Sequence, residues 1–368
     1  MTASEQEWLR IRGYLREHRY DLAVSAADEY SDSMRVVGTP LLAAATWIPV
    51  EPLPLDSIDL DFQPDLDTVD VAAAAGAVAP ALPQRPDGSR YDRYSQVIGE
   101  LAAPAVFENR PTYRLIEADL SRPSARLVFG RGAYFDGIDT GEASGHEYAA
   151  TQLGLPAGRL RAAIADPCSL RSRPANLAIS TLTIRHDRAA GEAVFLVHWR
   201  DPAKVGHAGG MYQVIPVGVF QPSGDARWNE RNDFDLWRGM IREFDEELRG
   251  ASEDYGSEQA PIDYAAWPFA ARMTAARENG GIRACCLGLG VDPLTFATDL
   301  LTAVVIDAPI FDELFGARVT ANAEGKVLAA QPFTDSVVTK LVRSQPMQAA
   351  GAALLSLAWK HRKAILEG

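Results

Sequence analysis

The stretch DLWRGMIREFDEEL, residues 235–248, decides the predicted fold. On a helix, its apolar residues share one face at spacings of three and four: Trp237, Met240, Ile241, Phe244 and Leu248. Glu243, Glu246 and Glu247 lie on a shoulder of the same helix, so their carboxylates converge. Converging carboxylates repel one another and favour either open water or a hard divalent cation. The stretch therefore predicts an amphipathic helix with a solvated acidic face or a cation site.

The order of residues 242–247 favours the cation site. It is an arginine, a glutamate, an apolar residue, any residue and two glutamates, and it resembles the core of the Nudix box. In that family the box helix holds magnesium against a pyrophosphate. The apolar run at 211–220, with Pro216 and Gly218, is similar to the strand and glycine-containing loop before such a box. The resemblance implies an α+β fold, with a Nudix-like alpha-beta-alpha sandwich and a mixed sheet over residues 176–368.

The resemblance also implies roles for individual residues. A phosphoanhydride, such as a nucleoside diphosphate linked to another group, is hydrolysed when water attacks a phosphorus atom, with Mg²⁺ or Mn²⁺ as the cofactor. The cation is held by Glu243, Glu246 and Glu247. Arg242 orients a glutamate, and Glu243 or Glu247 acts as a metal ligand or as the base, so the catalytic set is Arg242, Glu243 and Glu247. The expected substrate-binding residues are Gly209, Gly210, Tyr212, Gly218, Asp233 and Asp235.

Two positions differ from the family pattern. The glutamate expected eight residues before the box arginine is Phe234, and the glycine six residues earlier is Trp228. Asp233 or Asp235 is a candidate substitute for the glutamate. The differences support a second hypothesis, a non-catalytic sensor of a nucleotide or nucleotide sugar, or a transcriptional regulator. The whole chain also resembles uncharacterised bacterial proteins described as regulators. A third hypothesis is a scaffold in which the Nudix fold serves only for packing.

Composition restricts the class of protein. With 368 residues and 47% hydrophobic residues, the chain can form one large or two ordinary domains. No apolar run approaches the roughly 18 residues of a membrane span, so we expect no membrane partner. A net charge of -13 argues against a broad nucleic-acid surface. Three cysteines, two of them adjacent, form no disulfide framework, and we expect a cytoplasmic protein with a small phosphorylated ligand.

Residues 1–175 are predicted to form a separate N-terminal α/β region. Two helices within 5–30 are interpreted as a packing or dimerisation element, which makes a homodimer one expectation. A Pro- and Ala-rich segment, a helix and a hairpin follow, at 36–87, 91–101 and 113–129. The Gly-rich stretch 130–142 is either a tight turn with Asp139 or Thr140 capping a helix to Leu153, or an anion-binding loop at that helix.

The elements predicted for the second region follow the order of the sandwich. Strands are expected at 177–185, 193–200, 282–287 and 300–306, and helices at 264–277, 310–315, 335–342 and 348–366.

Overall fold

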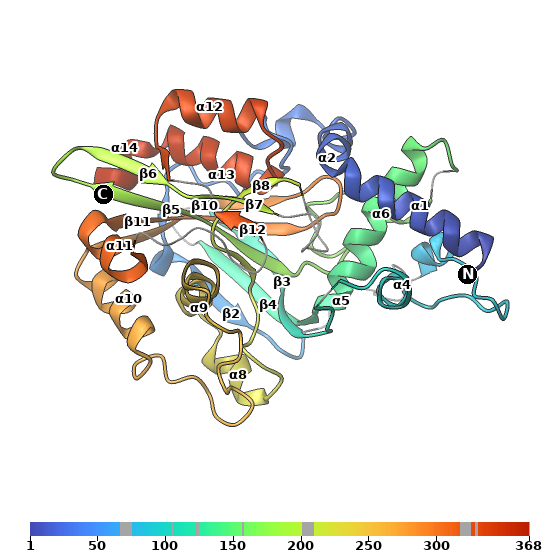
Figure 1. Ribbon diagram of the computed structural model, residues 1–368, viewed down its shortest axis with the longest axis horizontal. Coiled ribbons are helices and arrows are strands. Elements are labelled where there is room, and N and C mark those ends of the chain that lie inside the picture. The colour runs from blue at the N-terminus through green and yellow to red at the C-terminus, as the bar shows by residue number, and fades with distance from the viewer. Residues whose placement is uncertain are drawn as a thin grey trace.

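The computed structural model describes residues 1–66, 76–104, 106–121, 125–156, 158–200, 210–316, 325–327 and 330–367. A mixed sheet forms the centre of the molecule (Figure 1). Helices α12 (Asp335–Ser344) and α13 (Ala349–Lys360) lie over one face, and α9 (Leu236–Arg249), α10 (Pro268–Glu278) and α11 (Ala308–Phe315) lie over the other (Figure 1). The protein is therefore of the α+β class, as predicted.

The central sheet has the strand order β1-β10-β11-β5-β6-β13, and β9 also pairs with β5. Its strands are β1 (Leu53–Pro54), β5 (Leu177–Asp187), β6 (Glu192–Phe195), β9 (Val217–Val219), β10 (Ile282–Val291), β11 (Thr298–Asp307) and β13 (Gln331–Pro332). Strands β11 and β5 are parallel, whereas the other pairs are antiparallel. Every residue of β11 except the last is buried, as expected for a central strand covered on both faces.

Two three-stranded sheets complete the β-structure. One has the order β12 (Gly325–Val327), β7 (Val197–Arg200) and β8 (Tyr212–Val214), and the other β2 (Asp59–Phe62), β4 (Arg126–Ala133) and β3 (Pro111–Asp119). The predicted hairpin at 113–129 is confirmed by the antiparallel pairing of β3 and β4. The apolar run at 211–220 is divided at Pro216, so β8 and β9 belong to different sheets.

The remaining described α-helices are α1 (Ala3–Glu17), α2 (Arg19–Ala27), α4 (Tyr94–Leu101), α5 (Tyr134–Gly137), α6 (Ala143–Gln152), α7 (Leu160–Ile164), α8 (Arg227–Asn232) and α14 (Arg362–Glu367). Short 3-10 turns occupy Asp32–Met34, Val36–Gly38, Leu55–Ser57 and Ala79–Ala81. The prediction of one final helix over 348–366 is wrong, because α13 ends at Lys360 and α14 begins two residues later. None of the helices in the described ranges is long and apolar enough to cross a membrane.

The Gly-rich stretch 130–142 differs from both sequence-based interpretations. Strand β4 continues to Ala133, and helical backbone begins directly at Tyr134 and passes through a π-helical turn (Ile138–Glu142) into α6. The Asp139 carboxylate accepts a hydrogen bond from the Ser95 amide at 2.6 Å, and the Thr140 hydroxyl donates to the Asp136 carbonyl. Neither residue is the N-cap of α6, and no loop precedes α6, so the predicted cap and the predicted anion-binding loop are both wrong.

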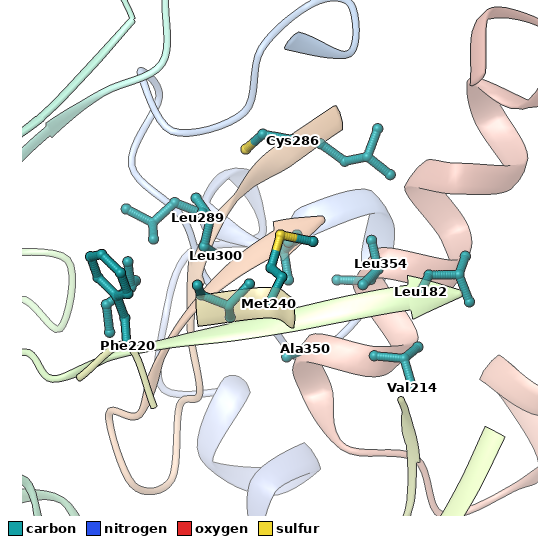
Figure 2. Packing of buried hydrophobic residues seen from close by; sticks show 14 of the residues in the cluster. Leu182, Val214, Phe220, Met240, Cys286, Leu289, Leu300, Ala350 and Leu354 are labelled. Atoms are coloured by element: carbon teal, nitrogen blue, oxygen red, sulfur yellow. The ribbon is translucent and has the colours of Figure 1, made fainter. Parts of the chain in front are cut away.

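The predicted N-terminal and C-terminal regions share one hydrophobic core. Its buried side chains run from Trp8 to Ile365. Strand β1, from the first region, pairs with β10 of the second, and the Tyr113 amide donates to the Phe220 carbonyl at 3.2 Å. Figure 2 shows Met240 of α9, Leu300 of β11 and Leu354 of α13 in this core. Residues 1–175 therefore help to build the surroundings of α9.

Candidate functional site

Local sequence determines where α9 begins and ends. The Asp235 carboxylate accepts a hydrogen bond from the Arg238 amide at 2.9 Å and caps the first turn. Gly250 ends the helix with a left-handed φ of 71°, a conformation that suits glycine. The predicted amphipathic helix is confirmed, because its apolar face is buried along the whole length. The same face carries Gly239, where a Cβ atom would lie 3.4 Å from the Phe220 ring.

Two glutamates of the acidic shoulder contact consecutive residues of β9. A Cβ atom on Gly218 would lie 1.9 Å from Cδ of Glu243, so this carboxylate occupies space that only a glycine leaves open. One turn later, Oε1 of Glu247 accepts a hydrogen bond from the Val217 amide at 2.8 Å. Both carboxylates line one cavity with these β9 residues. The i, i+4 spacing on the helix and the i, i+1 spacing on the strand therefore place the two carboxylates side by side.

The third glutamate of the shoulder has a different partner. The Tyr255 hydroxyl donates a hydrogen bond of 2.7 Å to Oε1 of Glu246. Burial raises the pKa of Glu246 to about 7, although the Tyr255 hydrogen bond acts in the opposite direction. Glu246 also lines the cavity. Burial therefore makes this carboxyl group a weaker acid than a glutamate in water.

The box arginine is part of a buried polar cluster. Arg242 pairs with Asp233 at 3.1 Å, donates to the Tyr264 hydroxyl at 3.3 Å, and donates to the Gln221 carbonyl. Asp233 is fully buried and also accepts hydrogen bonds from the Ser223 amide and hydroxyl and from the Tyr264 hydroxyl. Asp233 therefore connects the segment before α9 to the helix, because its carboxylate accepts hydrogen bonds from Ser223 and also pairs with Arg242 of α9.

The structure separates the other predicted substrate-binding residues from the cavity. Asp235 caps α9, and the Tyr212 amide in β8 donates to the Pro346 carbonyl. Gly210 has a φ of 81° and lines a smaller pocket that shares Arg19 and Met211 with the large cavity. Gly209 lies outside the described residues. Among the predicted substrate-binding residues that the structure describes, Gly218 alone lines the large cavity.

The large cavity has a volume of about 910 Å³. Besides α9 and β9, its walls include Arg19 and Glu142 from the N-terminal region, Arg173 from the segment before β5, and Asp299 from β11. None of the four was predicted as a site residue: Glu142 ends the Gly-rich stretch 130–142, and the other three are single charged residues outside any motif. A cavity of this size fits a nucleotide-sized ligand.

Asp299 is the most unusual carboxyl group of the missed set. It is 8% exposed and accepts a hydrogen bond from the Ser180 hydroxyl at 2.8 Å. Burial raises its pKa to about 7, far above the ordinary value of 3.8. It lies between Thr298 and Leu300 on β11, just before the strand predicted at 300–306, so the sequence gave no signal that it is buried.

Phe234 occupies the position where the Nudix pattern has a glutamate, and it packs in an aromatic cluster. Its ring centroid lies 5.0 Å from those of Phe62 and Tyr113, 5.5 Å from that of Phe129 and 5.7 Å from that of Phe220. Phe234 therefore contributes to packing between β2, β3, β4 and the segment before α9.

The carboxylates of α9 can provide only part of the ligand set of a divalent cation. Within the described ranges, no group of three or more His, Cys, Asp or Glu side chains is arranged to hold a metal ion. Mg²⁺ is often bound by one or two carboxylates together with the phosphates of a substrate and water. The adjacent Glu243 and Glu247 carboxylates fit that smaller ligand set.

Comparisons with known proteins gave little support for any family. No family model matches the chain, and no curated protein matches it. A solved structure with some similarity is a Nudix hydrolase from Alicyclobacillus acidocaldarius, with 16% sequence identity and a TM-score of 0.29. That match covers 53% of this chain and 96% of the other. A TM-score this low carries no conclusion about this chain.

Proposed function

We propose that the protein hydrolyses a phosphoanhydride, such as a nucleoside diphosphate linked to another group, in the cavity beside α9. The observation that carries the proposal is the placement of Glu243 and Glu247 together on Gly218 and Val217. The glutamates are four residues apart on the helix, and the strand has a glycine opposite them. Two carboxylates therefore lie together at the wall of a nucleotide-sized cavity.

A divalent cation is part of this proposal. Glu243 and Glu247 would hold Mg²⁺ or Mn²⁺, and the ion would neutralise negative charge on the phosphate oxygens. The protein orients the two carboxylates through β9, because the Val217 amide fixes one and the missing side chain of Gly218 makes room for the other. Arg242 supports the geometry indirectly, since its pairing with Asp233 anchors α9 to the preceding segment.

Glu246 is the residue that we assign as the general base. Glu246 lines the cavity beside the two proposed cation ligands, and burial raises its pKa, which makes its carboxylate a better proton acceptor. Its carboxylate would accept the proton of the attacking water on Oε2, while Tyr255 holds Oε1. In this assignment Glu243 and Glu247 bind the cation, and Glu246 accepts the proton.

The test is turnover of a panel of nucleoside diphosphate-linked compounds with and without Mg²⁺. We expect metal-dependent hydrolysis by the parent protein and at least a hundredfold loss in Glu243→Gln and Glu247→Gln, because each removes one ligand charge. Asp245→Asn is the matched control, since it removes an acidic side chain from the same helix at a position that pairs with Arg249. Equal turnover in the parent and both glutamine variants would refute the proposal.

A second candidate function is a sensor that binds a nucleotide without cleaving it. The observation in its favour is Phe234, because the position of the family's additional glutamate is filled by a ring in the aromatic cluster. Calorimetry with the same compounds distinguishes the two functions. Tight binding without product would favour the sensor, and product formation would exclude it.

A further inference from the structure

Arg173 is a buried arginine whose hydrogen-bond partners are all neutral. It lies in the segment before β5 and is 1% exposed. Its Nε donates to the Pro167 carbonyl at 2.9 Å, Nη1 to the Pro174 carbonyl at 3.4 Å, and Nη2 to the Thr298 hydroxyl at 3.0 Å. Burial lowers the pKa of Arg173 to about 10, so the guanidinium is still charged at neutral pH.

No carboxylate neutralises this charge at close range. Within the part of the chain that the structure describes, no Asp or Glu oxygen forms an ion pair with Arg173, and Asp166, the carboxylate that acts to raise its pKa, is exposed. A buried charge without a partner of opposite sign is strongly unfavourable. Such a residue is expected where a ligand provides the missing charge.

Arg173 also borders the large cavity. Pro174 and Thr298, which accept hydrogen bonds from Nη1 and Nη2, line the same cavity. Both acceptors of the Nη atoms therefore belong to residues of the cavity wall. A guanidinium has five N–H groups, and the three bonds named above leave two for a ligand.

We propose that Arg173 binds an oxyanion of a small ligand, a phosphate or a carboxylate group, in the large cavity. The planar guanidinium suits either group, because two parallel N–H donors match two oxygen atoms. The site is separate in sequence and in its elements from the carboxylates of α9. A ligand that occupies both carries one phosphate at the α9 carboxylates and a second anionic group at Arg173.

The experiment measures thermal unfolding of the full chain in EDTA at constant ionic strength, with sodium phosphate, sodium acetate or sodium chloride. Because an anion that binds only the folded protein stabilises it, the melting temperature of the parent should rise with phosphate or acetate concentration above the chloride baseline. The response should be lost in Arg173→Met, with at least a tenfold increase in the apparent dissociation constant. Arg185→Met is the control, because Arg185 pairs with Asp312 outside the cavity.

The response to each salt identifies the group. A rise with phosphate alone assigns a phosphate, and a rise with acetate alone or with both salts extends the site to carboxylates. An equal rise in Arg173→Met, or no rise above chloride in the parent, overturns the proposal. If Arg173→Met does not fold, a parent crystal soaked in selenate replaces it. An anomalous selenium peak within hydrogen-bond distance of the Arg173 guanidinium supports the site, and the lack of a peak there refutes it.

This inference does not depend on hydrolysis. The measurements contain no divalent cation and no turnover, so their result is independent of the proposed chemistry at Glu243 and Glu247. A phosphate response without any hydrolytic activity would refute the proposed function alone.

Discussion

Replacing Asp299 with asparagine should change how the stability of the protein depends on pH. The pKa of Asp299 is about 7 in the folded protein against an ordinary 3.8, so between these pH values the folded state binds more protons than the unfolded state. The free energy of unfolding therefore falls as the pH rises through this window. Asp299→Asn removes the titration and keeps an oxygen that can accept the Ser180 hydrogen bond.

The size of the effect follows from the two pKa values. The difference is about 3, and at 1.36 kcal/mol per pKa unit it corresponds to at most about 4 kcal/mol. Between pH 5 and pH 8 only about two pH units of this window are covered, which limits the change there to about 2.6 kcal/mol, and relaxation of the protein around a newly charged carboxylate reduces it to about 1 to 2.5 kcal/mol. Glu246 contributes with the same sign, and it contributes equally to the parent and the variant.

Urea denaturation at pH 5, 6, 7 and 8 measures the effect. The free energy of unfolding of Asp299→Asn should decrease less than that of the parent over this range, and the variant should be the more stable protein at pH 8. Asp312→Asn is the control. A hydrogen bond from Arg185 lowers the pKa of Asp312, so this residue is ionised in both states throughout the range and its replacement leaves the pH dependence unchanged. Parallel curves for the parent and Asp299→Asn would refute a buried, proton-binding Asp299.

Three further substitutions test the site around α9. Gly218→Ala places a Cβ atom 1.9 Å from Cδ of Glu243, so the carboxylate must move. We expect at least a tenfold loss of metal-dependent turnover with less than about 1 kcal/mol change in stability by urea denaturation, and unchanged kinetics would contradict the assigned role. Arg242→Met leaves Asp233 buried without its cation and should destabilise the fold by about 3 to 5 kcal/mol, whereas a loss below about 1 kcal/mol would show that the pair is dispensable. Tyr255→Phe removes a hydrogen bond that stabilises the charged carboxylate in the cavity, so the acidic limb of the plot of kcat against pH should move to higher pH, and a move to lower pH would exclude the assigned base.

Much of the secondary structure could be predicted from the sequence, because it depends on local periodicity and caps. The apolar spacing of α9, its Asp235 cap and its Gly250 terminus lie within sixteen residues of one another. Strands β10 and β11 could be predicted because each contains a continuous apolar run. The stretch 130–142 was not, because its glycines suggested a turn, whereas residues 130–133 extend β4 and residues 134–142 are helical, with Gly137 close to Asn176 and Gly141 close to Thr295.

The candidate site could be predicted only in part. The order of residues 242–247 identified the helix and its acidic shoulder, since that pattern is local. The division of labour among the glutamates could not be predicted, because Gly218, Val217 and Tyr255 reach them from other elements.

The sequence by itself determined an amphipathic acidic helix, strands to cover it and a composition suited to a packed core. Only the tertiary structure decided which charged groups are buried and what faces them. Asp233 meets Arg242, whereas Arg173 meets neutral acceptors from residues up to 125 positions away. The physical reason is that the free energy of a charge depends on its solvation and on nearby charges, and those surroundings are assembled by segments distant in the chain.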